Sequence, residues 1–542
     1  MSNLFILKTR RVSYIANIVK QPCDEEVIRG TPSVATCTDN SKPWVLAATI
    51  LGSSMAMIDG TVVNVALPTL QVSLHANVAD VQWIVESYAL FLAALILVGG
   101  SLGDRFGRRL IFACGVTLFA LSSVWCGLSP NVNQLILARS VQGIGGALLV
   151  PGSLAIISAS FDSEQRGQAI GTWSGFTAIT SALGPVLGGW LVENVSWRWI
   201  FFLNVPLAAI VLTILFWHVP ESRNEESARL DWWGAVLATL GLGAIVFGLI
   251  ESSNLTLMHP LVLSCLLAGS VILGAFIFVE SNNRHPMMPL TLFKSRTFSG
   301  ANLLTLLLYS ALGGIFFFLP FNLIQVQGYS PTAAGAVFLP FILIMFSLSR
   351  WSGGLVSRYG AKLPLTVGPT IAAFGFILFT LPGVGGSYWT TFFPAIVVLG
   401  VGMAISVAPL TTTVMGAVKQ RQAGVASGIN NAVSRTAGLL SIALFSIIML
   451  NSFNHSLDRR LAKLGIPPEI QHLLDNQRTN LAGAQIPPSV SAEMSKIITS
   501  AIAESFVDSF RLILWISALL ALCSVIVALL MIKRSPALSE TD

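Results

Sequence analysis

Apolar runs of about 20 residues recur along this chain and limit its fold more than any other feature. Within a bilayer every backbone polar group must be paired internally, so only helices and closed barrels can span it. Barrel strands alternate apolar and polar residues over about ten positions, whereas these runs are continuous and long enough for a helix to cross. Only 10% of the 542 residues are charged, against about 25% in a soluble domain. We therefore predict an all-α polytopic membrane protein.

Fourteen segments are predicted to cross the membrane, approximately 44–67, 80–102, 110–128, 134–159, 168–192, 199–218, 232–251, 261–280, 298–323, 332–352, 363–382, 389–412, 424–450 and 509–532. Cytoplasmic loops carry an excess of Lys and Arg. With the N-terminus placed inside, the short outer loops contain only Arg198. The inner loops contain the basic residues Arg105, Arg108, Arg109, Arg166, Arg223, Arg229, Arg284, Lys294, Arg296, Arg358, Lys362, Lys419 and Arg421. This asymmetry predicts a multi-pass protein of the cytoplasmic (inner) membrane with both termini in the cytoplasm.

The chain also repeats itself. The segment GSLGDRFGRR begins at Gly100, and a similar segment, GGLVSRYGAK, begins at Gly353, eight predicted helices later. Two six-helix halves separated by two inserted helices explain that offset, and parallel repeats are typical of secondary transporters. The predicted parts are a cytoplasmic tail 1–43, a first half 44–220, an insertion 221–297, a second half 298–532 and a tail 533–542.

One outer loop, 451–508, is long. It contains HSLDRRLAKLG and SAEMSKIITSAIAES, which are predicted to form short amphipathic helices. This loop is predicted either to cap the outer mouth of the protein or to be a passive connection.

Several function classes are disfavoured by the sequence. The net charge of +6 forms no basic stripe, so nucleic acid is not an expected partner. The six histidines, at positions 75, 218, 259, 285, 455 and 472, form no H-x-x-x-H pair, and the cysteines show no metal spacing. No phosphate-binding loop G-x-x-x-x-G-K is present. We therefore expect no metal, no cofactor and no enzymatic activity.

Charged residues inside the predicted helices are the first candidates for function. Asp59 lies about 15 residues into the first helix, roughly 22 Å along its axis, and Arg139 lies at a similar depth in the fourth. An ionised Asp there costs at least about 2.5–3.5 kcal/mol, so Asp59 is predicted either to couple transport to protons or to be a neutral, hydrogen-bonded residue. Arg139 is predicted to pair with Asp59, as a switch or as a fixed counter-ion. Glu86 is either a second acid in the same cavity or an ionised interfacial residue, and Arg435 needs a partner or a wet cavity.

Two glycine-rich segments are predicted to control helix movement and packing. The loop residues Gly100, Gly103, Asp104, Arg105, Gly107, Arg108 and Arg109 are predicted to form a conformational switch. In the fifth helix Gly184, Gly188 and Gly189 allow close helix contact, and Pro185 bends the helix. A substrate cavity between the halves is predicted to include Asn64, Gln142, Trp173, Phe176, Asn302, Tyr309, Phe317, Asn322, Gln325 and Arg435.

Four motifs resemble the major facilitator superfamily, specifically its fourteen-helix drug:H⁺ antiporters of the EmrB/QacA type. They are IDGTVVNVALP from Ile58, GSLGDRFGRR from Gly100, ARSVQGIGGA from Ala138, and LGPVLGG from Leu183, which is followed by WRWIFFLNVP. The resemblance covers about 44–532. It implies that Asp59 is the coupling acid, that Arg139 takes part in proton transfer, and that Arg435 is a recurrent residue of the thirteenth helix. It also implies that Asp104 meets the start of that helix and latches the outward-facing state, whereas the second copy has Ser357 at this position.

The resemblance predicts a proton-coupled exporter of hydrophobic or cationic drugs, driven by the proton gradient across the lipid bilayer. The alternative is an exporter of an endogenous metabolite, siderophore or amino acid with the same fold. In a host with two membranes, the resemblance also implies a periplasmic adaptor and an outer-membrane channel as partners.

Overall fold

The computed structural model describes residues 41–161, 163–223, 231–283, 286–418, 422–464, 466, 468–475, 477–484, 486 and 490–533, and it is helical throughout, with no strand among these residues. The predicted N-terminal tail, except for its last three residues, and the C-terminal tail beyond Lys533 lie outside the described residues.

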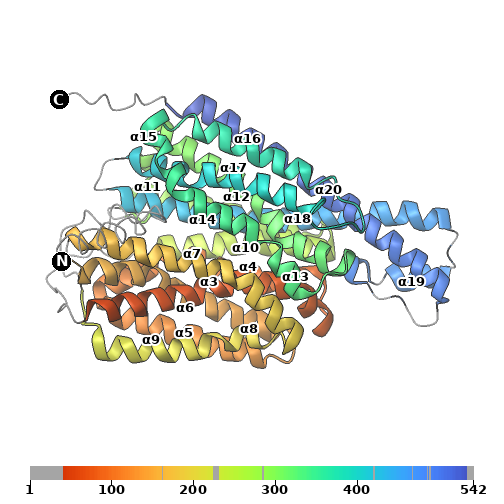
Figure 1. The fold of residues 1–542 in the computed structure, drawn as a ribbon, viewed down its shortest axis with the longest axis horizontal. Helices are drawn as coiled ribbons and strands as arrows, with labels where there is room; N and C mark the ends of the chain where they lie inside the picture. The colour runs from red at the N-terminus through yellow and green to blue at the C-terminus, as the bar shows by residue number, and fades with distance from the viewer. Residues whose placement is uncertain are drawn as a thin grey trace, which may run out of the picture.

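The six helices predicted for the first half pack together as an N-terminal bundle (Figure 1). They are α3 (Lys42–Ser73), α4 (Val78–Phe106), α5 (Arg108–Leu128), α6 (Val132–Ser160), α7 (Ser163–Asn194) and the sixth segment, which the structure divides into α8 (Trp199–Phe202) and α9 (Asn204–His218). Local polar residues set several of these boundaries. Asn77 and Asp80 form a reciprocal capping box at the start of α4, and the Asn131 side chain accepts from Gln134 N at the start of α6.

A second bundle contains the predicted second half. Its helices are α12 (Arg296–Phe321), which continues into the π-helical turn η2 (Asn322–Val326), then α13 (Pro331–Ala336), α14 (Leu339–Gly353), α15 (Leu355–Tyr359), α16 (Pro364–Leu378), α17 (Phe392–Gly416), α18 (Ala423–Leu464) and α20 (Ala492–Met531). A short helix η1 (Leu290–Lys294) precedes α12. The tenth predicted span, 332–352, thus corresponds to two helices, α13 and α14.

The two inserted helices, α10 (Trp232–Leu255) and α11 (Pro260–Asn282), pack chiefly against each other. Of the two, α10 also contacts α4 in the N-terminal bundle and α18 in the C-terminal bundle. The insertion therefore covers one side of the junction between the bundles.

The predicted membrane spans agree with the helices. Within the described residues, 13 helical segments are long and apolar enough to cross a bilayer. The remaining predicted span, 363–382, corresponds to the shorter apolar helix Pro364–Leu378. The fold is therefore that of a polytopic α-helical membrane protein, with fourteen apolar segments in the predicted places.

The two amphipathic segments predicted within 451–508 are helical, as expected, but they are not short helices of their own. Instead α18 continues to Leu464 and α20 begins at Ala492, so both helices extend well beyond their apolar parts. We call these extensions, with α19 (Pro468–Asp475) and η4 (Arg478–Gly483), the cap. Helix α19 lies at the end of the molecule opposite to the C-terminal end of α20 (Figure 1). Arg460 pairs with Glu504 and, at 2.7 Å, with Asp508 across the two extensions. An apolar pattern indicates which part of a helix lies in the bilayer, but not where the helix ends, so it did not predict these extensions.

Candidate functional site

Asp59 lies at the centre of a network of buried polar side chains in the N-terminal bundle. Its Oδ2 atom pairs with Arg139 Nη1 at 2.5 Å, and its Oδ1 atom accepts a hydrogen bond of 2.8 Å from Gln142 Nε2. Asn204 Nδ2 lies 3.5 Å from the same Oδ1 atom. All four side chains are buried. The predicted contact between Asp59 and Arg139 is therefore present, and both carboxylate oxygens have donors.

Four helices bring this network together. Asp59 lies inside α3, and Arg139 and Gln142 lie one turn apart on the same face of α6. Asn204 is the first residue of α9, and Ser123 of α5 accepts hydrogen bonds from Gln142 Nε2 at 2.8 Å and Asn204 Nδ2 at 3.3 Å. Because every side chain in the network comes from one bundle, the network can stay intact while the bundles move against each other.

The Arg139 guanidinium has partners besides Asp59. Its Nε atom donates to the Ile84 carbonyl at 3.1 Å, and its Nη1 atom donates to Gln142 Oε1 at 2.6 Å. Its Cζ atom lies 4.3 Å from the centre of the Tyr88 ring and 5.9 Å from that of Phe201, distances that suit cation–π attraction. A buried charge without partners is costly. The guanidinium would therefore remain bound if Asp59 became neutral.

Glu86 lies outside this network, so the prediction of a second acid in the same cavity is wrong. The interfacial alternative is also wrong, because Glu86 is 0% exposed. Ile84 and Tyr88 contact Arg139 from α4, whereas Glu86, midway between them, points away from Arg139, because successive positions of a helix differ by about 100°. Neither carboxylate oxygen of Glu86 has a hydrogen-bond partner among the described residues.

Arg435 lies in α18 and therefore belongs to the other bundle. Its Nε atom is buried and lacks a hydrogen-bond partner within the described part of the chain. The Tyr88 side chain lies within electrostatic reach of it, so Arg435 faces the N-terminal bundle. The same Tyr88 ring lies against Arg139, so Tyr88 stands between two arginines of different bundles.

The predicted switch loop connects α4 to α5 at the end of the molecule opposite to the cap (Figure 1). Asp104 pairs with Arg108 Nη2 at 2.8 Å, and Arg108 Nη1 donates to the Ala155 carbonyl of α6 at 3.4 Å. Gly107 has φ +118°, a backbone conformation that L side chains rarely adopt. The implied contact of Asp104 with the start of α18 adjoins residues 419–421, which lie outside the described residues, so it stays a prediction.

The other side of the switch loop is held by the segment after α9. The Glu221 carboxylate accepts hydrogen bonds from the backbone nitrogens of Arg109 at 2.9 Å and Leu110 at 3.1 Å. A carboxylate is favoured there because these are the first amide groups of α5. Arg109 Nη1 also donates to the Val219 carbonyl at 3.0 Å. The loop is therefore joined to α9, and among the remaining predicted loop residues Arg105 lies over the Phe106 ring, whereas Gly100 and Gly103 have room around them.

The fifth predicted helix, α7, packs closely against α3 in its own bundle and against α13 in the C-terminal bundle, as its glycines predict. A Cβ atom at Gly184 would lie 2.0 Å from Thr61 Oγ1, and one at Gly188 would lie 2.9 Å from Val62 Cγ2, both on α3. A Cβ atom at Gly189 would lie 2.2 Å from the carbonyl oxygen of Pro331, in α13. A Cβ atom at Gly335, also in α13, would lie 2.1 Å from the Pro185 carbonyl oxygen. This motif therefore joins the N-terminal bundle to the C-terminal one.

The residues predicted to line one cavity are spread over the molecule. Gln142 belongs to the Asp59 network, and buried Trp173 donates to Ser53 Oγ at 3.0 Å inside the N-terminal bundle. Phe176 is exposed, and Asn64 and Tyr309 are half-buried. In the C-terminal bundle Asn302, Phe317 and Asn322 are buried, and Asn302 accepts a hydrogen bond of 3.1 Å from Asn430. The sequence indicated which residues are polar within apolar helices, but not the direction in which each side chain points.

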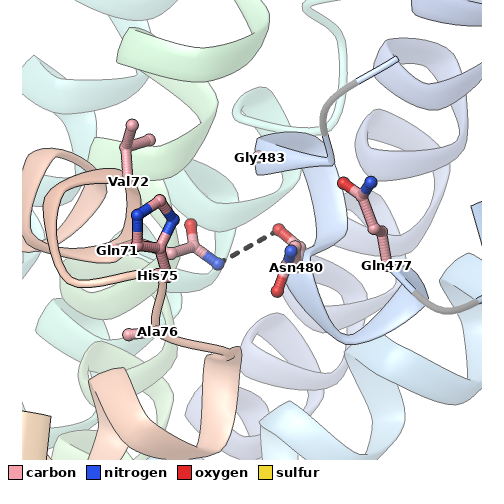
Figure 2. Close-up of a pocket in the computed structure, with 7 residues that line it drawn as sticks. All are labelled: Gln71, Val72, His75, Ala76, Gln477, Asn480 and Gly483. Carbon is pink, nitrogen blue, oxygen red and sulfur yellow. Dashed lines mark hydrogen bonds between the residues drawn. The ribbon is translucent and has the colours of Figure 1, made fainter. Parts of the chain in front are cut away.

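Gln325 lies near the cap rather than in a central cavity. Its Nε2 atom donates to Gln71 Oε1 at 2.8 Å, which joins η2 to the last turn of α3. Gln71 Nε2 in turn donates to the Asn480 carbonyl of η4 at 3.1 Å, as Figure 2 shows. A cavity of about 210 Å³ opens beside this contact, lined by Gln71, Val72, His75, Ala76, Gln477, Asn480 and Gly483. The cap therefore contacts both bundles, as the first of its two predicted roles requires.

Several members of the Asp59 network were missed by sequence reasoning. Asn204 lies inside the motif WRWIFFLNVP but was not singled out, and Ser123 and Tyr88 were not considered. The available signal for Asn204 was an amide side chain within a strongly apolar helix, since such residues are rare and usually pair inside the protein. Ser123 offered no such signal, because small hydroxyl residues are common in membrane helices.

Comparison with known proteins agrees with this architecture. Residues 49–442 match the model of the Major Facilitator Superfamily. The chain is 33% identical over 435 residues to the multidrug resistance protein Stp of Mycobacterium tuberculosis, covering 79% of this chain and 80% of that protein. It is 32% identical to the tetracenomycin C resistance and export protein of Streptomyces glaucescens, covering 91% and 93%.

Solved structures show the same fold. A bacterial homologue of the human lysosomal transporter Spinster, in an inward-facing and occupied conformation, superposes with a TM-score of 0.66. The alignment covers 92% of this chain and 100% of that one, at 18% identity. The family match over most of the chain and the identities to the bacterial relatives establish that this protein is a membrane transporter of the major facilitator superfamily.

Proposed function

We propose that this protein is a proton-coupled antiporter that exports hydrophobic or cationic drugs across the cytoplasmic membrane. Its relatives are named for resistance to several unlike compounds, among them tetracenomycin C, lincomycin and puromycin. Relatives named for resistance to such different compounds favour a drug exporter over a carrier of one metabolite.

The observation that carries the proton coupling is the buried contact between Asp59 and Arg139. An aspartate held inside a membrane protein by one arginine and two amide side chains is stable while it is charged. Protonation of Asp59 at Oδ2 removes the attraction to Arg139. Arg139 then keeps only neutral partners, the Ile84 carbonyl, the Gln142 oxygen and the Tyr88 ring, so it stays hydrogen-bonded but loses its counter-ion.

A route from this exchange to the bundles runs through α4. Arg139 contacts Ile84 and Tyr88, both on α4, and α4 packs against α18 of the C-terminal bundle. A change in the position of Arg139 therefore acts on α4, the helix of the N-terminal bundle that packs against the C-terminal one. Movement of α4 against α18 is the step that would convert a proton gradient into alternating access.

The contacts between the bundles support an inward-open state, in which the end with the cap is closed. Near that end α7 touches α13 at Gly189 and Pro331, and Gln71 bonds Gln325. Glu193 of α7 also accepts a hydrogen bond of 3.1 Å from Thr332 N of α13. With the cap outside, as the distribution of basic residues predicts, a compound would enter from the cytoplasm and leave past these contacts.

Everted membrane vesicles containing this chain test the proposal. With ethidium as the probe, an imposed proton gradient should drive concentrative uptake into the vesicles, and a protonophore should abolish it. Asp59→Asn should reach the membrane normally and lose concentrative uptake, whereas Asp475→Asn in the cap should keep it. Full concentrative uptake by Asp59→Asn would contradict the proposed role of Asp59.

A further inference from the structure

Glu86 lies on the face of α4 opposite to the Asp59 network, and the mechanism above leaves it without a role. We propose that Glu86 is a second proton-binding residue, in a site at the junction of α4 and α18 that the inserted helix α10 completes. It is protonated whenever this junction is closed, so that the transport cycle carries a second proton. This inference rests on the proposed proton coupling for its transport consequence, but its site can be tested without transport.

The first observation is an excess of hydrogen-bond acceptors. Both carboxylate oxygens of Glu86 are buried without a partner among the described residues. The Oε1 atom of Gln82, one turn earlier on the same face of α4, is also buried without a partner. Three acceptors therefore lie along one helix face with no donor. Buried polar atoms in native proteins are nearly always bonded, so the missing element is a hydrogen donor.

The second observation is the apolar character of the surroundings. Positions 79, 83, 86, 90 and 93 recur at the spacing of one helix face, with Glu86 in the middle. The other four residues on this face pack into a hydrophobic cluster with residues of α10 and α18. The buried members of the cluster are Ala79, Leu90, Ala93, Val246, Leu249, Ile250, Leu439, Ala443 and Ile447. An ionised carboxylate there would be an unpaired charge in an apolar environment, which is costly.

The third observation is that three helices close this site. Gln82 Nε2 donates to the Ile442 carbonyl of α18 at 3.3 Å, which joins the two bundles beside Glu86. Trp83 Nε1 donates to Glu251 of α10 at 3.4 Å, and its ring lies 5.9 Å from that of Phe247. The third wall is therefore supplied by α10, and this gives the inserted pair of helices a role in shielding Glu86 from lipid.

The charged and titratable groups on these elements do not neutralise Glu86. On α4 the groups nearest to Glu86 in the helix are Asp80, near the helix start, and Tyr88, which contacts Arg139 on the opposite face, whereas Asp104 and Arg105 lie at the far end of the helix. On α10 Glu251 bonds Trp83, and Asp80 lies within electrostatic reach of it. On α18 Arg435 lies within electrostatic reach of Tyr88, and none of these groups forms a hydrogen bond with Glu86 among the described residues. Asp59 of α3 and Arg139 of α6 pair with each other on the opposite side of α4.

A single proton bound to Glu86 explains all three observations. Bound to one carboxylate oxygen of Glu86, it removes the unpaired charge and creates an O–H group that can donate to Gln82 Oε1, one turn away. When α4 separates from α18, water reaches the site and the carboxylate can ionise. Closure of the junction then requires a new proton. Glu86 thus binds a proton in the closed junction and releases it in the open one.

Infrared spectroscopy of the purified full-length protein in lipid tests the site without any substrate. A protonated carboxylic acid has a C=O band that is separate from that of a carboxylate and shifts in D2O. We expect this band in the wild type and its loss in Glu86→Gln, which has nearly the same shape. Asp59→Asn and Glu251→Gln should keep the band, and Glu86→Asp should keep a shifted one. Retention of the full band in Glu86→Gln would overturn the proposal. The proposal would also fail if the wild type showed the band only after sodium and potassium ions were removed, because Glu86 would then bind a metal ion instead of a proton.

Ethidium transport at a fixed pH gradient tests the second proton. A gradient of one pH unit drives about a tenfold concentration ratio for each proton exchanged. Glu86→Gln, which cannot carry a proton, should therefore lower the steady-state ratio about tenfold, while Asp475→Asn in the cap matches the wild type. An unchanged ratio in Glu86→Gln would overturn the second proton. If the wild type itself shows no dependence on the gradient, the proposed function fails, while the infrared measurement still decides the protonation of Glu86.

Discussion

Asp59 and Glu86 are both acidic residues buried among transmembrane helices, yet their surroundings differ in every respect. Asp59 has one arginine and two amide side chains as donors, all from the N-terminal bundle. Glu86 has no donor among the described residues, and its neighbours come from α4, α10 and α18. One acid is therefore arranged to be charged, and the other is arranged to be neutral. The comparison shows that burial of a carboxyl group does not by itself determine its function.

The location of each acid suits its surroundings. The Asp59 network lies within one bundle, so its hydrogen bonds can survive movement between bundles. Glu86 lies where two bundles and the insertion meet, so its surroundings change whenever the bundles separate. Burial of a neutral carboxyl group in the closed junction costs less free energy than burial of an ionised one. When the junction opens, water can hydrate the carboxyl group.

Replacement of Asp59 should have the largest effect on stability. Asp59→Leu leaves Arg139 as an uncompensated buried charge, which costs about 3–5 kcal/mol. We expect a clearly lower midpoint in thermal or denaturant unfolding of the purified protein in detergent. Asp475→Asn, at the exposed cap, is the control and should unfold like the wild type. A wild-type midpoint for Asp59→Leu would show that Arg139 does not depend on this partner.

Gln142 tests whether the amide side chains are part of the same network. Gln142→Met has a similar size but removes the 2.8 Å hydrogen bond to Asp59 and the acceptor for Arg139. A hydrogen bond to a charged group contributes about 1.5–3 kcal/mol, so the free energy of unfolding should fall by that amount. In the double variant Asp59→Leu/Gln142→Met the two losses should not add. Additive losses would mean that Gln142 acts independently of Asp59.

Tyr88 lies at the edge of the Asp59 network and should have an intermediate effect. Tyr88→Leu removes the ring 4.3 Å from the Arg139 guanidinium, which should cost about 1–2 kcal/mol in the unfolding measurement. Tyr88→Phe keeps the ring and should unfold nearly like the wild type. Equal losses in the two variants would assign the effect to the hydroxyl group instead of the ring.

Glu86 should show the smallest stability effect, which sharpens the contrast with Asp59. Glu86→Leu replaces an acid without partners by an apolar residue in an apolar cluster, and such replacements are often neutral or stabilising. We expect the free energy of unfolding to change by less than about 1 kcal/mol or to increase. A loss as large as that of Asp59→Leu would indicate a buried partner of Glu86 and would remove the difference between the two acids.

The candidate site was only partly predictable from the sequence. Asp59 and Arg139 were identified because charged residues are rare in long apolar runs, and equal depths in neighbouring helices made their contact an expected one. Gln142 was assigned to the substrate cavity, and Glu86 to the cavity of Asp59, because sequence gives the depth of a residue but not its direction around the helix. That direction depends on the neighbours of each helix, which only packing determines.

The cap shows a similar limit for secondary structure. Apolar composition placed the ends of the last two spans near 450 and 509, where the bilayer was expected to end. The helices continue because their polar faces pair with each other, as Arg460 does with Asp508 at 2.7 Å. Pairing between segments more than 40 residues apart is not visible in a hydrophobic pattern.

The sequence by itself determined the helical architecture, the fourteen apolar segments, the internal repeat and the identity of the rare charged residues inside them. It could do so because the bilayer imposes the same requirement on every segment, and that requirement can be read one segment at a time. Only the tertiary structure decided which of those residues meet: Asp59 with Arg139 inside one bundle, and Glu86 alone between three helices. Those outcomes depend on the rotation of each helix about its own axis, which is fixed by packing against its neighbours.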